Sequence, residues 1–284
     1  MKIMILGASG MLGNALFRLF SSQVDFQAVG TIRAAHSKIL FSDGLDKNLI
    51  CGIDVENTDH LIRIIEMEKP DVVINCIGLV KQHSESSDPL ASIPINSLLP
   101  HRIALICSMS GARFIHFSTD CVFSGNKGFY KESDEADARD LYGVSKFMGE
   151  VSGNYALTLR TSIIGHELQG CKSLINWFLS QQSSCEGFRQ AYFSGMPTVE
   201  IGKVLLKYVL PNPGLSGIYH VSTDKISKYD LLKTVARIYG KNIKIIPNDT
   251  FKIDRSLDSS KFRAETGFVP KSWEELVMEM YEFH

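Results

Sequence analysis

Apolar residues in the first half of the chain form short β-branched runs that alternate with amphipathic stretches. The runs predicted as strands are "KIMIL" (2–6), "FQAVGTI" (26–32), "DVVINCIG" (71–78), "ARFIHFS" (112–118) and "YALTLRTS" (155–162). Between them, apolar positions recur at helical spacing, as in "NALFRLF" (14–20) and "DHLIRIIEM" (59–67). Alternating strands and helices predict a parallel sheet that is covered by helices on both faces.

After residue 162 this rhythm loosens. Three stretches rich in turn-forming residues, "QQSSCEG" (181–187), "PNPGLSG" (211–217) and "IPNDT" (246–250), are predicted as turns. The expected fold is therefore α/β, with a Rossmann-type, doubly wound parallel sheet over residues 1–162 that parts of 196–222 complete. Residues 163–284 are expected to form mainly a smaller, irregular C-terminal module that binds substrate.

A glycine-rich loop, "GASGMLG" (7–13), directly follows the first predicted strand, and a helix is expected to begin at its end. Gly7 permits a tight turn, Gly10 lets backbone amides approach a pyrophosphate, and Gly13 lets the helix pack closely on the strand. Within a βαβ unit this pattern favours a dinucleotide site over a plain glycine turn. The residues expected to bind the cofactor here are Gly7, Gly10, Met11, Leu12 and Gly13.

The end of the second predicted strand indicates which dinucleotide binds. No acid is present there to hydrogen-bond the ribose of NAD, but Arg33 is suited to a 2′-phosphate, so NADP(H) is expected to be preferred, with NAD(H) still open. The alternative for Arg33 is a solvated loop residue. Asp54 is expected either to bond the adenine amino group or to stabilise a turn, and Gly78 either to let backbone approach the cofactor or simply to end its strand.

Tyr142 and Lys146 in "DLYGVSK" lie four residues apart, a spacing that places both side chains on one face of a helix. A second such pair, Tyr229 and Lys233, is preceded by no comparable strand end and is interpreted as structural. The first pair instead follows "HFSTDCVFSG" (116–125), in which a strand ends on polar residues where open α/β sheets bind ligands. The polar residues expected to line the site are Ser118, Thr119 and Asp120.

Reduction of a ketone requires a hydride donor and an acid that protonates the developing alkoxide. A free phenol, with a pKa of about 10, is a poor acid–base group near neutral pH, but an ammonium one helical turn away lowers that pKa. Tyr142 is therefore the candidate acid, Lys146 its activator, and Thr119 a hydrogen-bond donor to the same carbonyl oxygen. The alternative is a surface tyrosine beside a solvated lysine.

In this order and spacing, "GASGMLG", "STDCVF" and "YGVSK" resemble the extended short-chain dehydrogenase/reductase family. Four later blocks resemble the dTDP-4-dehydrorhamnose reductases: "LRTSIIG" (159–165), "FSGMPT" (193–198), "GIYHVS" (217–222) and "RSLDSSKF" (255–262). The resemblance implies NADPH- or NADH-dependent reduction of the 4-keto group of a nucleotide-linked 6-deoxy sugar. It assigns Thr119, Tyr142 and Lys146 as the hydroxyl, the acid and the lysine that also holds the cofactor ribose.

The chain departs from this family at three positions. Cys121 and Ile163 stand where sugar-facing aromatic residues are usual, and such losses can change substrate choice by orders of magnitude. Ala15 stands where some members have an acid that binds magnesium at a dimer contact, so no metal is expected, while a homodimer stays open. The reaction class is thus expected to carry over better than the sugar.

Arg255 in "DRSLDSS" is expected to bind the substrate diphosphate, with a surface salt bridge as the alternative. Two other functions are compatible with this fold. One is a nucleotide-sugar epimerase that retains its nicotinamide. The other is a non-catalytic, NADP-binding partner of another protein, as in the regulatory subunit of methionine adenosyltransferase.

Composition narrows the partners and the compartment. Lysine and arginine number 30 against 31 acids, a net charge of −1, which gives no electrostatic footprint for nucleic acid. The six cysteines are scattered without metal-ligand spacing, and no pair of histidines has such spacing either. Since no apolar run approaches a membrane span, we expect a cytoplasmic protein that binds no membrane.

Overall fold

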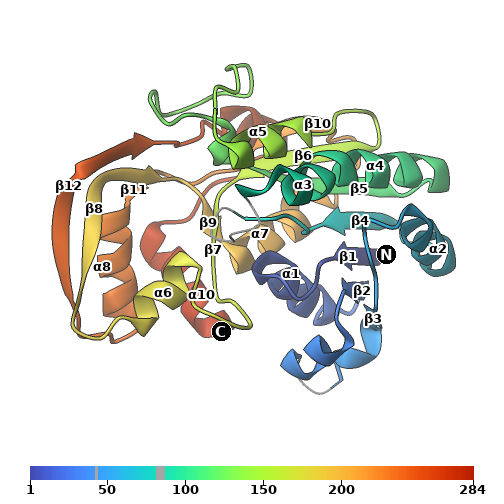
Figure 1. Cartoon of the computed structure of the whole chain (residues 1–284), viewed down its shortest axis with the longest axis horizontal. Coiled ribbons are helices and arrows are strands. Elements are labelled where there is room, and N and C mark those ends of the chain that lie inside the picture. Colours follow the sequence, from blue (N-terminus) through green and yellow to red (C-terminus); the bar gives the residue numbers. More distant parts are fainter. Residues whose placement is uncertain (42–43, 81–86) are drawn as a thin grey trace. The chain divides into compact units, whose positions relative to one another are not determined.

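The computed structural model describes residues 1–41, 44–80 and 87–284 (Figure 1). Its internal contacts divide the chain into two compact units. Unit 1 comprises Met1–Ser118, Arg139–Leu159 and Asn212–Ile218, and unit 2 comprises Thr119–Ala138, Arg160–Pro211 and Tyr219–His284. The chain therefore passes between the two units more than once.

The main sheet has seven strands in the order β10-β6-β5-β4-β1-β2-β3, and the pairings from β3 to β5 are parallel. The strand order reverses between β1 and β4, which makes their carboxyl ends the expected ligand crevice. This arrangement confirms the predicted doubly wound α/β class. The strands are β1 (Lys2–Leu6), β2 (Gln27–Ile32), β3 (Leu49–Cys51), β4 (Val72–Asn75), β5 (Arg113–Thr119), β6 (Ala156–Thr161) and β10 (Gly217–His220).

Helices bury the sheet because each presents an apolar stripe to it. Leu61 and Ile65 of α2 (Thr58–Glu68) and Ile103 of α4 (Leu99–Ser110) share one core cluster with β-strand residues such as Met4 and Phe114. The remaining helices of unit 1 are α1 (Met11–Ser21), α3 (Pro89–Ser92), the π-helical η4 (Ile93–Leu98), α5 (Leu141–Met148) and two 3-10 helices, η1 (Ala35–Leu40) and η2 (Asp46–Asn48).

Among the residues that the structure describes, one continuous helical segment, Pro89–Ser110, is long and apolar enough to cross a membrane by length and composition alone. The sequence analysis found no apolar run of this length, because charged and polar residues interrupt the apolar residues of this segment. Leu99, Ile103 and Ile106 of this segment are buried in the core cluster of unit 1, which is typical of the core helix of a globular protein.

Unit 2 contains a three-stranded sheet in the order β11-β8-β12 (Figure 1). β8 (Ser184–Phe193) pairs in parallel with β12 (Lys244–Asp254) and antiparallel with the short β11 (Ile226–Ser227). Helices α8 (Lys228–Ile238) and α10 (Trp273–Phe283) contribute Leu231 and Val277 to its core cluster. The other elements are η5 (Asp120–Val122), β7 (Ile163–Ile164), α6 (Leu174–Ser180), β9 (Met196–Pro197), α7 (Thr198–Val204), η6 (Leu205–Val209) and α9 (Ser260–Thr266).

Two of the three predicted turns were wrong. Most of 181–187 lies in β8, where Cys185 is buried between exposed Ser184 and Glu186, so polar residues on the outer face of a strand had resembled a turn. All of 246–250 lies within β12, whose place at the edge of its sheet tolerates Pro247. The stretch 211–217 is a turn up to the start of β10.

Candidate active site

The glycine loop has the geometry that its sequence predicts. Gly7 has a φ of +84°, and a Cβ added there would lie 2.7 Å from Cγ1 of Ile77. A Cβ at Gly13 would lie 2.2 Å from the carbonyl oxygen of Gly7, so only glycine allows this approach of α1 to the loop. Gly10 is the N-cap of α1 and offers no side chain to the amides of Met11 and Leu12, which leaves those amides suited to an anion.

The structure supports a cofactor-binding role to different degrees for Arg33, Asp54 and Gly78. Arg33 is exposed directly after β2, as a 2′-phosphate ligand would be. The carboxylate of Asp54 accepts a hydrogen bond from the Glu56 amide (3.0 Å), which favours the turn alternative. A Cβ on Gly78 would lie 3.8 Å from Nζ of Lys146, so Gly78 brings the end of the β4 loop close to that lysine.

Lys146 is buried near the ends of two central strands. It is 6% exposed and donates a hydrogen bond from Nζ to the carbonyl oxygen of Phe117 (2.7 Å). Burial lowers the pKa of Lys146 to about 8, although Glu150 and Cys76 raise it. The lysine is therefore no solvated surface group, and its ammonium is held where it can act on a neighbour.

Tyr142 lies one turn before Lys146 on α5, which confirms the predicted helix. The backbone of α5 is fixed to the preceding helical segment, because Ser145 accepts a hydrogen bond from Nδ2 of Asn96 (3.2 Å) and Ser97 donates to the Ser145 carbonyl (2.8 Å). Sequence reasoning missed these anchors. The polar "NS" within the apolar run 93–99 was the available signal.

A buried amide shapes the bend that follows β4. Asn75 accepts the amide of Ile77 at its Oδ1 (3.0 Å) and contacts Nδ1 of His116 with its Nδ2 (3.2 Å). Because the amide nitrogen can only donate, the imidazole accepts at Nδ1 and is neutral. Burial, with smaller contributions from Lys146 and His101, lowers the pKa of His116 well below its usual value. His116 therefore has a core role.

Thr119 ends β5, and its hydroxyl is already hydrogen-bonded. It donates to Oδ1 of Asp120 and accepts the amide of Cys121, both at 3.1 Å. A ligand carbonyl would have to replace Asp120 as the acceptor. Asp120 is 7% exposed, and burial raises the pKa of its carboxyl although Arg255 opposes that shift. Ser118 donates to Glu150 (2.6 Å) and is engaged within the protein.

Arg255 lies inside unit 2 and makes no surface salt bridge among the described residues. Its Nε donates to the carbonyl oxygen of Phe123 (2.8 Å), and its Nη1 lies 3.5 Å from the sulfur of Cys121. Burial raises the pKa of Cys121 to about 12, so this thiol is neutral. Ile163 is half-buried in β7, where it pairs with Met196.

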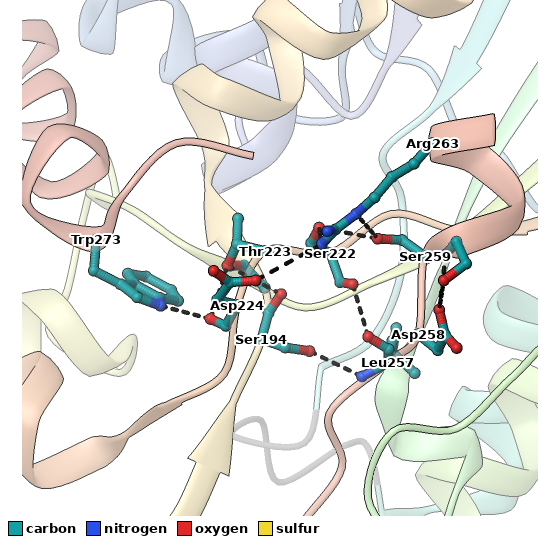
Figure 2. A network of polar contacts seen from close by, with 11 residues as sticks. Ser194, Ser222, Thr223, Asp224, Leu257, Asp258, Ser259, Arg263 and Trp273 are labelled. Carbon is teal, nitrogen blue, oxygen red and sulfur yellow. Dashed lines mark hydrogen bonds and ion pairs between the residues drawn. The ribbon is translucent and has the colours of Figure 1, made fainter. Parts of the chain in front are cut away.

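Three of the four blocks that carried the narrower resemblance, 193–198, 217–222 and 255–262, take part in one network of polar contacts in unit 2 (Figure 2). The Leu257 amide donates to Ser194 (3.0 Å), and Ser222 donates to the Leu257 carbonyl (2.8 Å). Arg263 donates from Nε to Ser259 (3.0 Å), which in turn donates to the Ser222 carbonyl (3.2 Å). These contacts hold the segment that follows Arg255.

Metal ligation has no basis in these residues. Ala15 is a buried residue of α1, 5% exposed, and has no ligating atom in its side chain. Within the described parts of the chain, no three histidine, cysteine, aspartate or glutamate side chains gather as a metal site would require.

Comparisons with known proteins agree with this geometry. The family model of the RmlD substrate-binding domain matches residues 1–283. A probable low-salt glycan biosynthesis reductase, Agl14, of Haloferax volcanii is 26% identical, covering 94% of this chain and 93% of its own. The dTDP-4-dehydrorhamnose reductase of Burkholderia thailandensis is 32% identical over 57% of this chain and 50% of its own. Methionine adenosyltransferase 2 subunit beta of Rattus norvegicus is 26% identical over 84% and 72%.

Solved structures share the fold at low identity. A hypothetical dTDP-4-dehydrorhamnose reductase from Sulfolobus tokodaii has a TM-score of 0.78 and 23% identity, covering 96% of this chain and 98% of its own. The Bacillus anthracis dTDP-4-dehydrorhamnose reductase in complex with NADP has a TM-score of 0.79 and 20% identity, covering 99% and 98%. The chain therefore belongs to the RmlD substrate-binding domain family, which confirms its resemblance to the dTDP-4-dehydrorhamnose reductases, NAD(P)H-dependent oxidoreductases that act on a sugar ketone.

Proposed function

We propose that this protein reduces the 4-keto group of a nucleotide-linked sugar with NADPH. The observation that carries the proposal is the buried ammonium of Lys146, one helical turn from Tyr142 and close to Gly78. In the alternative of a surface tyrosine beside a solvated lysine, nothing would favour burial of this charge, whereas a phenol that must lose a proton near neutral pH needs a charge beside it. Family membership supports the same reaction class.

The residues of unit 1 fit the cofactor. The lack of a side chain at Gly13 lets the start of α1 pack closely on the Gly7 carbonyl, and the first amides of α1 would bind the pyrophosphate. Arg33 would neutralise a 2′-phosphate and so favour NADP(H). When bound, the nicotinamide supplies the hydride. Lys146 would also hydrogen-bond the ribose from its position beside Gly78.

Tyr142 is the general acid in this proposal and protonates the carbonyl oxygen as hydride arrives. Lys146, with a pKa of about 8, is still mostly protonated at pH 7 and stabilises the phenolate that remains. Thr119 turns its hydroxyl from Asp120 to the carbonyl oxygen and orients it. The substrate pool and NADPH that this reaction needs, together with six free cysteines, support a cytoplasmic location.

The test compares two tyrosines that share the same spacing to a lysine. NADPH oxidation is followed with a panel of 4-keto nucleotide sugars in wild type, Tyr142→Phe and Tyr229→Phe. Tyr142→Phe should lower turnover by about 10² to 10⁴ with NADPH binding intact, and Tyr229→Phe should stay within about twofold of wild type. Unchanged turnover in Tyr142→Phe would refute the proposed acid.

Two other functions predict different results. The relationship to a subunit of methionine adenosyltransferase 2 supports a partner protein, which would bind NADPH, turn over no sugar and co-purify with an unrelated enzyme. An epimerase would retain its nicotinamide through purification and would need no added cofactor. A reductase should be purified largely free of nicotinamide and should consume one NADPH for each sugar reduced.

A further inference from the structure

Unit 2 brings two cations to one buried carboxyl group, in a set of four residues that we call the cationic cluster: Asp120, Cys121, Lys228 and Arg255. The register of the three-stranded sheet explains why they meet. Ser227 of β11 and Asp254 of β12 both pair with Tyr192, on opposite sides of β8. Lys228 and Arg255 each follow directly on one of these residues, so both lie within about one residue of the level of Tyr192, Lys228 toward Ala191 and Arg255 toward Phe193.

The donors of these two cations lack strong acceptors. Nε of Arg255 donates to the Phe123 carbonyl, but in the described parts of the chain its Nη1 meets only a thiol at 3.5 Å, and a neutral thiol is a weak acceptor. Lys228 is half-buried, and within the described residues its ammonium makes no hydrogen bond or ion pair, only longer-range interactions with the rest of the cluster.

Neighbouring cations of the same unit donate to carboxylate, hydroxyl or carbonyl oxygens. Lys225, three residues before Lys228, pairs with Asp254 at 2.8 Å and lies between the rings of Phe129 and Tyr192. Arg263 donates to Ser259 and to the Ser222 carbonyl (Figure 2). The open donors of the cationic cluster are therefore a local feature and no general property of this surface.

Charge in the cluster is also unbalanced. Asp120 is its single acid, and the side chains that hydrogen-bond its carboxyl are the hydroxyl of Thr119 and the thiol of Cys121. Because burial favours the protonated form of this carboxyl, Asp120 compensates for at most one of the two cations. Half-buried cations without an acceptor are unfavourable unless an anion binds them.

The position of the cluster along the chain indicates which anion binds. Cys121 is two residues from Thr119, so their Cα atoms are at most about 7 Å apart, roughly the width of one sugar ring. If Thr119 orients the keto oxygen, the cations next to Cys121 reach a substituent of the same ring. A cysteine in place of the aromatic residue expected there leaves room for that substituent.

We propose that the cationic cluster binds a carboxylate on the sugar ring itself, so that the substrate is a nucleotide-linked keto sugar acid and not a 6-deoxy sugar. This proposal rests on the proposed function, in which Thr119 and Cys121 face the sugar. It replaces the sequence-based expectation that Arg255 binds the diphosphate. Arg255 forms a two-pronged contact with the carboxylate, and Lys228 adds a second charge.

The test uses stable reduced sugars and the complex of the enzyme with NADP⁺. UDP-galacturonic acid carries a carboxylate on the ring carbon where UDP-6-deoxygalactose carries a methyl group, and the two are otherwise identical. The panel also contains the corresponding pair with gluco stereochemistry and the same pairs linked to dTDP. In calorimetry, at least one nucleotide-linked sugar acid of the panel should bind about 10²-fold more tightly than its 6-deoxy counterpart, because its carboxylate forms charge-assisted hydrogen bonds. NADP⁺ reduction by the same sugars should follow the same order.

Variants assign the preference to the cluster. Arg255→Met should lower the ratio of the two affinities by about tenfold or more, and Lys228→Met should lower it independently. The matched controls are Arg189→Met and Arg237→Met, which remove exposed cations of unit 2 that already pair with Asp249 and Glu274 and should leave the ratio unchanged. Retained NADP⁺ binding shows in each case that the variant is folded.

Three outcomes would overturn the inference. Equal affinity for acid and 6-deoxy sugar in every pair of the panel would exclude a carboxylate subsite while leaving the reductase intact. Equal weakening of both sugars in Arg255→Met, with the ratio unchanged, would assign the arginine to the shared diphosphate. If NADP⁺ binds but no nucleotide sugar does, the proposed function itself fails, and the inference fails with it.

Discussion

The two Tyr/Lys pairs of this chain have the same spacing and opposite surroundings. Lys146 on α5 is buried, donates to a strand carbonyl and has a lowered pKa. Lys233 on α8 is exposed, and its ammonium lies 5.4 Å from the ring centroid of Tyr229. The first lysine is held in an unfavourable environment, while the second makes an ordinary surface cation–π contact. Equal spacing is therefore compatible with two very different environments, and only the first gives a buried lysine with a lowered pKa.

The largest expected difference between the pairs is in turnover. Lys146→Met should lower kcat/KM by about 10³, because the phenol of Tyr142 loses its charged neighbour and the cofactor a hydrogen bond. Lys233→Met should stay within about twofold of wild type. Steady-state NADPH oxidation measures both. Similar losses in the two variants would show that the comparison reflects folding and not catalysis.

The same lysine should have the opposite effect on stability. Its folded pKa of about 8 lies below the unfolded value of 10.5, so the unfolded chain binds more protons between these values. Stability attributable to Lys146 therefore rises as pH increases from 8 to 10.5, by about 3 kcal/mol at most. At pH 7, Lys146→Met should unfold at higher urea concentration than wild type. The advantage should shrink by pH 10, and Lys233→Met should show no such trend.

His220 tests whether burial of a base has the same effect outside the candidate active site. Desolvation, and to a smaller extent Arg160, lowers its pKa to about 4. The unfolded chain therefore binds more protons between pH 4 and 6.5, and stability is lost as pH falls through this window. Between pH 7 and 4.5, His220→Gln should lose about 2 to 3 kcal/mol less stability than wild type in urea unfolding. An identical pH dependence would contradict the buried neutral imidazole.

The smallest expected effects concern the residues that anchor α5 and α8, which should differ in their effect on kcat. Asn96 bonds both Ser145 of α5 and the backbone of Leu79 (2.9 to 3.2 Å), so Asn96→Ala should cost about 2 kcal/mol and lower kcat as well. Ser227 caps α8, and Ser227→Ala should cost about 1 kcal/mol without changing kcat. Equal kcat in the two variants would mean that α5 needs no such anchor.

Local patterns in the sequence were sufficient for five of the seven strands of the main sheet and for the glycine loop. β-branched runs marked β1, β2, β4, β5 and β6, because parallel strands buried on both faces read as continuous apolar segments. They were insufficient for β8 and β12, whose exposed outer positions carry turn-forming residues. Here pairing between distant segments decided the conformation, and no short window of sequence contains that pairing.

The sequence by itself determined what depends on neighbours along the chain: the positive φ of Gly7, the close packing of Gly13 on the Gly7 carbonyl, and the shared helical face of Tyr142 and Lys146. Only the tertiary structure decided which of the two equally spaced lysines, Lys146 or Lys233, is buried. It also decided where Arg255 points, since its Nε meets Phe123 across 132 residues of chain. Burial and long-range hydrogen bonds set the charge state and the reach of a side chain, and both arise only once separate segments pack together.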